Sequence, residues 1–285
     1  MAKGYVLYNP LAGDGKAEED AKLLQMLLDE TLLYYDITRI TNYEAFIGGM
    51  TQEDYLVIVG GDGTLNRFVN DTDGLEISRE ILYLPAGTRN DFSRDMGENL
   101  YPITKDLKAL PSVEVNGKRY RFINGIGFGL DSYCCHAGNA LRKIPGKKIN
   151  YPGIAMQGLL FRFSPRNATV TVDGKEYTYK KVWLAPTMHG RYCCGGMIPA
   201  PRQDRNSGKL SVMLMHGRSR LRTLFVFSGI FKGRHVKHTN TVDVYTGREI
   251  TVEFDQPTPL QIDGEIILNV TRYTAKAAVC GGSLC

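Results

Sequence analysis

A run of apolar residues that ends in a glycine-rich turn constrains this chain more than any other feature. Residues 55–59 read Tyr-Leu-Val-Ile-Val, and Gly60-Gly61-Asp62-Gly63-Thr64 follows directly. A continuous β-branched and apolar run is typical of a strand that is covered on both faces, as in a parallel sheet. Three glycines at the end of such a strand let backbone N–H groups approach a phosphate, and Asp62 adds a carboxylate that suits Mg²⁺. The alternative is a turn that only reverses the chain.

The patterns around this run alternate between strands and helices. Strands are predicted at 5–8, 37–40 and 80–84, and residues 17–33 place small and apolar side chains on one helical face. Strands that are separated by helices predict an α/β layer. We therefore expect an α/β nucleotide-binding domain with a parallel sheet over residues 1–112.

Short strands and tight turns take over after this region. Asn116-Gly117 lies between two short strand-like runs, and Asp173-Gly174 separates two more. These residue pairs are favoured in two-residue hairpin turns. Several short strands with such turns predict an antiparallel β-sandwich domain over residues 113–270. Residues 271–285 are expected to form a tail that returns to the first domain.

A second polar loop follows the strand that comes next after the glycine-rich turn. Its sequence is Pro-Ala-Gly-Thr-Arg-Asn-Asp-Phe over residues 85–92. Thr88 and Asn90 supply hydrogen-bonding side chains, and Asp91 supplies a second carboxylate. Because ligands of α/β sheets bind at the carboxyl ends of the strands, this loop and residues 60–64 should line the same pocket. The alternative is a capped helix start, with Asn90 or Asp91 as the N-cap.

Three further segments add candidate functional residues. Residues 9–16 read Asn-Pro-Leu-Ala-Gly-Asp-Gly-Lys, which is similar to a phosphate loop but lacks the GxxxxGK[ST] pattern. Asp263-Gly264-Glu265 offers carboxylates that can accept a proton from a hydroxyl. Residues 124–131 form a glycine-rich segment that ends in Asp131. Taken singly, these segments also fit ordinary turns or a bulged strand.

Together, in this order and at these separations, the motifs resemble those of the bacterial diacylglycerol kinases and YegS-like lipid kinases, relatives of the sphingosine kinases. GGDGT alone is shared with NAD kinases, whereas GGDGT with the NDF loop and the late DGE is highly specific. The resemblance extends over essentially the whole chain. It implies an NAD-kinase/diacylglycerol-kinase-like α/β domain, a C-terminal β-sandwich, and transfer of the γ-phosphoryl group of ATP to a hydroxyl of a diacylglycerol-like membrane lipid, with Mg²⁺.

The resemblance also assigns roles to individual residues. Glu265 is the favoured catalytic base, with Asp263 as the alternative, and Asp62 acts with them. A nucleotide-contacting threonine matches Thr41, with Thr38 as the alternative. The other nucleotide-binding residues that it implies are Asn9, Gly60, Gly61, Asp62, Gly63, Thr64, Leu65, Asn66, Thr88 and Asn90. The metal ligands that it implies are Asp62, Asp91, Asp131 and Asp204.

Three positions depart from the family pattern, and the mildest change is Ser93, where the family usually has Ala after NDF. Arg67 stands where the family has a Glu after the nucleotide loop, so the loop is expected to be held differently. Ser207 stands where the family has an Asp that helps to hold a structural magnesium in the second domain. Either Asp204 compensates for that change or the metal is absent.

Charge and composition restrict the partners and the location. The formal net charge of +5 fits an enzyme that handles nucleotides or touches an anionic membrane, and is too weak to indicate nucleic acid. Basic stretches at 142–148, 218–222 and 232–238 could meet lipid headgroups, although most such runs are solvated surface. No apolar run reaches the roughly 20 residues of a membrane-spanning helix.

The expected location is cytoplasmic, with peripheral contact at the inner face of the membrane where a lipid substrate is presented. The N-terminus has no signal-peptide pattern, and the six cysteines are expected to be reduced. The sequence leaves a homodimer open and does not identify the lipid. Two alternatives also stay open: an NAD kinase-like enzyme, and a non-catalytic nucleotide- or lipid-binding protein on the same fold.

Overall fold

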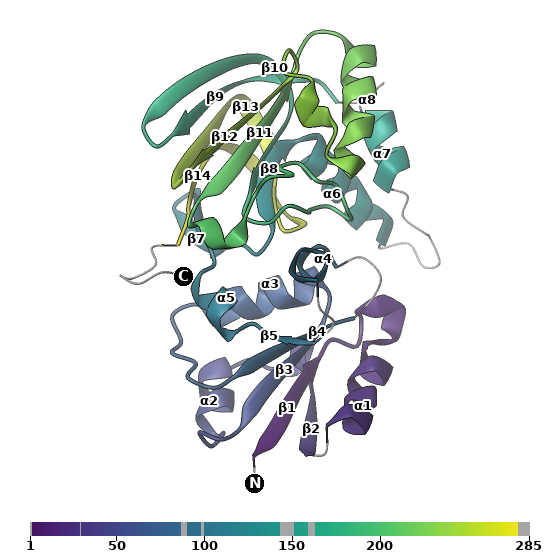
Figure 1. Ribbon diagram of the computed structural model, residues 1–285, viewed down its shortest axis with the longest axis vertical. Helices are drawn as coiled ribbons and strands as arrows, with labels where there is room; N and C mark the ends of the chain where they lie inside the picture. The colour runs from purple at the N-terminus through teal and green to yellow at the C-terminus, as the bar shows by residue number, and fades with distance from the viewer. Residues whose placement is uncertain are drawn as a thin grey trace. The chain divides into compact units, whose positions relative to one another are not determined.

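The chain folds into two compact units that divide between Ala109 and Leu110, close to the predicted boundary at 112/113. Figure 1 shows the helices and strands of both units. The computed structural model describes residues 2–28, 30–86, 90–97, 100–142, 151–158 and 163–278. Within these residues, none of the helices is both long and apolar enough to cross a lipid bilayer.

The first unit is an α/β domain built on a five-stranded sheet of order β2-β1-β3-β4-β5. All neighbouring strands are parallel except β4 and β5, which confirms the predicted parallel sheet. The strands are β1 (Lys3–Tyr8), β2 (Thr31–Asp36), β3 (Tyr55–Gly60), β4 (Ile81–Pro85) and β5 (Tyr101–Pro102). The helices are α1 (Ala17–Leu27), α2 (Tyr43–Gly48), α3 (Asp62–Asp71), α4 (Asp91–Met96) and α5 (Thr104–Lys108).

The sheet of the first unit is buried on both faces, as its apolar central strand requires. Helix α1 packs on one face through Ala17, Ala21 and Leu24, against the valines of β1 and β3. Leu56 and Ile58 alternate with those valines along β3, so they point to the opposite face, and both are fully buried. Because the strands are covered on both sides, polar residues gather at their ends.

Two predicted boundaries in this unit are wrong. The helix predicted over 17–33 ends at Leu27, and the strand predicted at 37–40 lies earlier, as β2. Residues Ile37–Arg39 form a 3₁₀ helix instead. The Asp36 carboxylate accepts hydrogen bonds from the backbone N–H of Thr38 over 2.9 Å and from its hydroxyl over 2.6 Å. Such local side-chain bonds to the backbone compete with strand pairing.

The second unit is built on a nine-stranded antiparallel sheet of order β12-β11-β10-β8-β13-β14-β6-β7, with β9 paired to both β10 and β13. The strands are β6 (Ser112–Val115), β7 (Lys118–Arg121), β8 (Gly125–Gly129), β9 (Arg166–Val172), β10 (Lys175–Met188), β11 (Leu210–His216), β12 (Val242–Gly247), β13 (Glu249–Ile262) and β14 (Glu265–Lys276). The helices are α6 (Leu130–Arg142), α7 (Tyr151–Gln157) and α8 (Arg220–Ser228).

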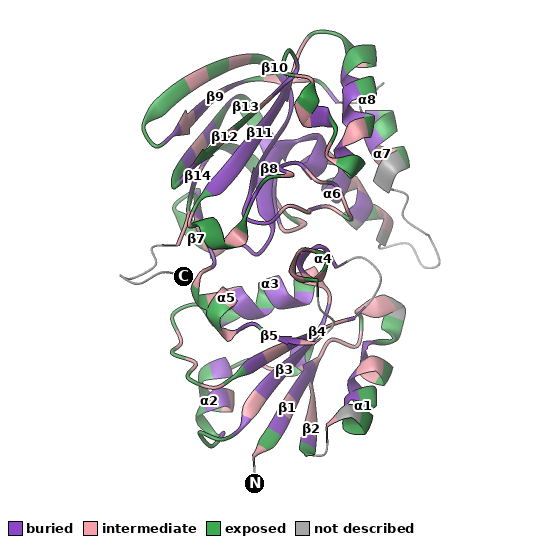
Figure 2. Cartoon of the chain, in the orientation of Figure 1, coloured by how far each residue is buried: buried purple, intermediate pink, exposed green. Residues whose placement is uncertain are grey.

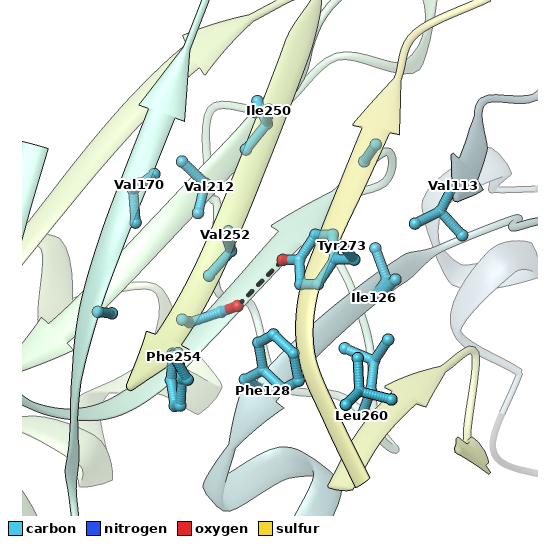
Figure 3. Packing of buried hydrophobic residues seen from close by; sticks show 14 of the residues in the cluster. Val113, Ile126, Phe128, Val170, Val212, Ile250, Val252, Phe254, Leu260 and Tyr273 are labelled. Atoms are coloured by element: carbon cyan, nitrogen blue, oxygen red, sulfur yellow. Dashed lines mark hydrogen bonds between the residues drawn. The ribbon is translucent and has the colours of Figure 1, made fainter. Parts of the chain in front are cut away.

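Two long strands, β10 and β13, make this sheet fold back on itself. Their first halves pair with β9 and their second halves pair with β8. The sheet therefore encloses a core, which Figure 3 shows from close by. The Phe128 ring lies 4.8 Å from that of Phe254 and 5.3 Å from that of Tyr273, between ring centroids. The prediction of a second, sandwich-like β domain is confirmed.

The hairpins of the second unit use the turn residues that the sequence indicates. Asn116-Gly117, Asp173-Gly174 and Asp263-Gly264 each join two antiparallel strands, and both residues of each pair have positive φ. Positive φ at both central residues is the requirement of a type I′ turn. The predicted tail at 271–285 begins too early, because residues 271–276 belong to β14 in the second unit. Residues 279–285 lie outside the described residues, so the return of the tail to the first unit stays a prediction.

Candidate active site

Three strands of the first unit end at the same edge of its sheet, and the candidate loops follow them. Strand register places Tyr8 beside Val59 and Gly60 beside Pro85. The backbone N–H of Ala86 donates to the Gly60 carbonyl over 2.9 Å. The segments that begin at residues 9, 60 and 85 therefore start from neighbouring strands at the carboxyl edge, where α/β sheets bind ligands.

Asp62 joins two of these loops directly. It is the first residue of α3, and its carboxylate accepts hydrogen bonds from the backbone N–H of Asp91 over 2.8 Å and of Phe92 over 3.2 Å. Those two residues begin α4, so the carboxylate sits at a helix N-terminus, where negative charge is stabilised. The described parts of the predicted loops 60–64 and 85–92 thus lie together. Thr88 lies outside the described residues.

Asn90 is the N-cap of α4, which was the structural alternative for this loop. Its side-chain oxygen accepts a hydrogen bond from the backbone N–H of Ser93 over 2.8 Å. Its amide nitrogen donates to the Tyr83 hydroxyl, and that hydroxyl donates to the Gly60 carbonyl over 2.9 Å. The buried Asn90 side chain is therefore bonded to protein atoms. Sequence reasoning missed Tyr83, because its place in a strand gives no sign of a loop contact.

Asn9 ties the first loop to the glycine-rich turn. Its amide nitrogen donates to the Thr64 hydroxyl over 2.9 Å, and its oxygen accepts from the Leu11 N–H over 3.0 Å. Gly60 is needed for this contact, because a Cβ there would lie 2.6 Å from the Thr64 side chain. A Cβ on Gly63 would meet nothing within 4 Å. The first turn of α3 therefore has open space beside it, and helix N-termini attract phosphates.

Other predicted nucleotide contacts within α3 are less accessible. The Leu65 side chain is fully buried, and Asn66 is buried with its backbone carbonyl bonded to Asn70 over 2.9 Å. Arg67 is exposed and pairs with Asp71 over 3.3 Å. The departure at Arg67 thus lies on the solvent side of α3, and the expectation that it changes how the loop is held stays a prediction.

A pocket of about 740 Å³ opens beside the carboxyl ends of β1 and β2. Tyr8, Tyr34, Arg39 and Thr41 are among the residues that line it, and this volume is in the range of small-molecule sites. Thr41 was the favoured match to a nucleotide-contacting threonine. The alternative, Thr38, is bonded to Asp36 instead. The tyrosine rings offer flat apolar surfaces, and Arg39 forms an ion pair with Asp36, another lining residue, over 3.3 Å.

The two carboxylates of the DGE turn, on Asp263 and Glu265, have different surroundings in the second unit. The Asp263 carboxylate accepts hydrogen bonds from the backbone N–H groups of Ile123, Asn124 and Gly125, over 2.6, 2.8 and 2.9 Å. Asp263 therefore fixes the hairpin turn against the start of β8, whose first residue is Gly125. Glu265 is paired with Ile262 through the strand ladder, whereas its side chain is exposed and forms no hydrogen bond or ion pair with the described residues, so its carboxylate stays accessible.

Asp131 is buried near this turn and is linked to it through Gln261. The Gln261 amide donates to Asp131 Oδ2 over 3.2 Å, and its oxygen accepts from the Gly264 N–H over 3.0 Å. Burial raises the pKa of Asp131 to about 6. A Cβ on Gly127 would lie 2.5 Å from Asp131 Oδ2, so the glycine-rich strand β8 makes room for this carboxylate. Sequence reasoning missed Gln261, which belongs to no motif.

The predicted metal ligands are divided between the two units. Asp62 and Asp91 are neighbours in the first unit, whereas Asp131 and Asp204 belong to the second. Among the residues described, no group of three or more His, Cys, Asp or Glu side chains is placed to hold a metal ion. Magnesium often uses only one or two carboxylates together with substrate phosphates, so Asp62 and Asp91 fit a nucleotide-bound Mg²⁺.

The residues around Asp204 do not fit a structural magnesium. The exposed Asp204 carboxylate caps a short 3₁₀ helix by accepting the Asn206 N–H over 2.9 Å. The Ser207 hydroxyl donates to the Asp204 carbonyl over 2.6 Å. Hydrogen bonds therefore hold this segment, and the expectation that Asp204 replaces the missing family carboxylate as a metal ligand is not supported.

Known proteins match this chain over both units. Residues 3–117 match the family model described as the diacylglycerol kinase catalytic domain, and residues 124–278 match the YegS C-terminal NAD kinase beta sandwich-like domain. A diacylglycerol kinase of Mycobacterium tuberculosis (strain H37Rv) is 31% identical over 219 residues, which covers 72% of this chain and 67% of that protein.

Solved structures add support for the fold. A diacylglycerol kinase structure from Bacillus anthracis str. Sterne has a TM-score of 0.61 at 17% identity and covers 97% of this chain and 94% of its own. A second structure from the same organism has a TM-score of 0.65 at 21% identity, with coverages of 96% and 93%. The two family models and the M. tuberculosis relative show that the chain belongs to the diacylglycerol kinase and YegS-like family of lipid kinases.

Proposed function

We propose that this protein transfers the γ-phosphoryl group of ATP to a hydroxyl of a membrane lipid similar to diacylglycerol. The observation that carries the proposal is the bonding of the Asp62 carboxylate to the start of α4, which unites two polar loops at the carboxyl edge of the sheet. Phosphoryl transfer depends chiefly on positioning and charge neutralisation, which such a rigid arrangement favours.

The nucleotide is proposed to lie along this edge. Its phosphates would accept hydrogen bonds at the start of α3, where Gly63 leaves open space. Its nucleoside would occupy the pocket lined by Tyr8, Tyr34 and Thr41. Asp62, with Asp91, would hold Mg²⁺, which supplies neutralisation of phosphate charge when it is bound.

The acceptor step is assigned to the second unit. The lipid hydroxyl oxygen forms a bond to the γ-phosphorus, the bond from that phosphorus to the bridging oxygen breaks, and ADP leaves. Glu265 accepts the hydroxyl proton, because its carboxylate is exposed. Asp263 is a positioning residue, since its carboxylate already accepts three backbone N–H groups.

The test is a kinase assay with ATP, Mg²⁺ and diacylglycerol in detergent micelles, in which the lipid product is identified by its mass. We expect a phosphorylated lipid from the wild type and a loss of at least about a hundredfold in rate for Asp62→Asn and for Glu265→Gln. Arg67→Ala, on the solvent side of the same helix, is the matched control and should keep its activity.

Three results would overturn the proposal. Full activity in Asp62→Asn would remove that residue from the mechanism. Phosphate on NAD rather than on lipid would favour the NAD kinase-like alternative. Nucleotide binding without a phosphorylated product, across a panel of lipids with free hydroxyl groups, would favour a non-catalytic binding protein.

A further inference from the structure

Helix α8 of the second unit carries apolar residues on both its buried and its exposed face. Val226 and Phe227 are buried in a core cluster with residues of β10 and β11. On the outer face, Leu221 is 74% exposed and Phe225 is 69% exposed, one helical turn apart. Figure 2 shows the exposed residues along this helix. A surface helix normally has a polar outer face, so these two side chains need an explanation.

A third apolar side chain extends the same exposed segment. Phe231 lies in the 3₁₀ helix η5 (Gly229–Lys232), which follows α8 directly, and it is 39% exposed. Its ring packs edge-on to the buried Phe227 at 6.2 Å between centroids. Single exposed apolar residues are common on soluble proteins, but a group of them marks an interaction surface.

Cations flank these apolar side chains in the sequence. Arg218, Arg222 and Lys232 are exposed, and none of them forms an ion pair with a residue that the structure describes. Residues 205–242 contain eight Lys and Arg residues and no Asp or Glu. Arg220 has a different task, because it donates to the Phe163 carbonyl over 3.1 Å and lies 5.2 Å from the Trp183 ring centroid.

We infer that the exposed face of α8 and η5, which we call the α8 face (Arg218, Leu221, Arg222, Phe225, Phe231 and Lys232), docks on an anionic lipid bilayer. Apolar side chains flanked by Arg and Lys are the pattern of helices that lie in the membrane interface. The apolar side chains enter the headgroup boundary, and the cations bind lipid phosphates. The inference rests on the proposed function, because a lipid kinase must reach a substrate that lies in the membrane. It adds the surface through which the protein would reach that substrate.

Charge complementarity is the reason to prefer a bilayer over a second copy of this chain. The α8 face is uniformly positive around its apolar centre, and its segment has no carboxylate that could pair with the cations of a symmetric partner. Two like surfaces would bring arginines against arginines. An anionic bilayer supplies negative charge over its whole surface and an apolar layer beneath it.

The experiment measures co-sedimentation of the full chain with vesicles, which needs no turnover. One set of vesicles is phosphatidylcholine, and the other is a two-to-one mixture of phosphatidylcholine and phosphatidylglycerol. Arg218→Gln/Arg222→Gln should lower partitioning onto the anionic vesicles by roughly 30-fold and should weaken its salt dependence. Leu221→Ser/Phe225→Ser should lower partitioning onto both kinds of vesicle by at least about tenfold.

The matched controls come from exposed positions elsewhere on the chain. Lys175→Gln/Arg248→Gln removes two exposed cations of the second unit, and Met26→Ser removes a side chain of α1 that is 84% exposed. Both controls should bind vesicles like the wild type. Thermal melts should show that all variants stay folded, because each substituted side chain is exposed.

The outcomes separate this inference from the proposed function. Vesicle binding that is unchanged in both α8 variants, or lost equally in the controls, overturns the docking surface. So does a change of molar mass by light scattering in Leu221→Ser/Phe225→Ser with vesicle binding unchanged, which would make the face a contact between copies. A wild type without kinase activity on any lipid would sink the proposed function, whereas vesicle binding would still decide the docking surface.

Discussion

Gly60 is tightly constrained in size within the glycine-rich turn of the candidate site. Its missing Cβ leaves room for the Thr64 side chain, which in turn accepts the hydrogen bond from Asn9. Gly63, three residues on and within α3, has open space where a Cβ would be. The two glycines therefore differ in what they do for the fold, although both belong to the same motif.

Gly60→Ala should destabilise the protein by about 1–3 kcal/mol, because the added methyl overlaps the Thr64 side chain. Gly63→Ala should be neutral or stabilising by up to about 1 kcal/mol, since it replaces a helical glycine without a clash. Urea denaturation of both variants is the measurement. Equal free energies of unfolding in the two variants would contradict the packing described at Gly60.

Asp131 is a buried carboxylate whose protonation affects stability. Burial raises its pKa from 3.8 to about 6, so the folded protein binds this proton more tightly than the unfolded chain does. Tighter proton binding by the folded state contributes stability that is fully present below the ordinary pKa of Asp131, 3.8. That contribution is lost as the pH rises through about 6, the pKa in the folded protein. At neutral pH the Asp131 carboxylate is therefore ionised while it is buried, which lowers the free energy of unfolding.

Asp131→Asn should be more stable than the wild type at pH 8, by on the order of 2–3 kcal/mol, because it removes that charge. The difference should close as the pH falls below 4, where the wild-type carboxyl is protonated. Urea unfolding from pH 4 to pH 8 tests this. Parallel pH profiles in the two proteins would show that the carboxyl does not titrate between those limits.

The hairpin between β13 and β14 is the element that presents the candidate base. Both central residues have positive φ, and the Asp263 carboxylate fastens the turn to the backbone that leads into β8. Gln261, at the end of β13, connects the same turn to Asp131 at the start of α6. The position of Glu265 thus depends on the β13–β14 hairpin itself, on the backbone at the start of β8 and on the start of α6.

Asp263→Ala should cost about 3 kcal/mol of stability, because three buried N–H groups lose their acceptor. Asp263→Asn is the matched control, since it keeps one acceptor oxygen and a residue type that tolerates positive φ, and it should cost less. Glu265→Gln should stay within about 0.5 kcal/mol of the wild type and still lose turnover. Denaturant unfolding and the lipid kinase assay, run on the same preparations, distinguish the structural role of Asp263 from the proposed catalytic role of Glu265.

Local chemistry made part of these elements predictable. Asn-Gly and Asp-Gly favour positive φ by themselves, so the hairpins at 116–117 and 173–174 could be predicted from the sequence. The loop at 60–64 could be predicted because it follows an apolar run. Tyr83 and Gln261 could not, because each gains its role only when the fold brings distant residues to it.

The errors in the first unit also have a physical cause. Leu24, Leu28 and Leu32 continue a helical spacing past the end of α1, so the apolar pattern alone does not reveal where the helix stops and β2 begins. The strand was then predicted too late, over residues that the Asp36 side chain holds in a 3₁₀ turn. The Asp36 side chain, bonded to the backbone, thus decided the second of these boundaries.

The chain as a whole consists of two units with separate cores, and the proposed function gives them different ligands. Nucleotide should stabilise the first unit, and at a concentration of a hundred times Kd the gain should be about 2.7 kcal/mol. The single tryptophan, Trp183, is buried in the second unit, so its fluorescence reports on that unit. Circular dichroism reports on both.

Thermal unfolding with and without Mg-ATP therefore tests whether the protein binds nucleotide. The transition seen by circular dichroism should move to higher temperature, because ligand binds the folded state only. If the units unfold separately, the Trp183 transition stays in place; if they unfold together, it moves as well. No shift in either signal would count against nucleotide binding, and Asp62→Asn should reduce the shift.

Transfer of labelled phosphate from ATP is the most direct measurement of the proposed lipid kinase activity. The wild type and Asp62→Asn are incubated with ATP labelled in its terminal phosphate, Mg²⁺ and a total bacterial lipid extract, and labelled products are identified by mass. We expect label on a lipid hydroxyl with the wild type and none with Asp62→Asn. Label that never reaches a lipid, or that reaches it equally well with Asp62→Asn, would refute the proposed lipid kinase activity through Asp62.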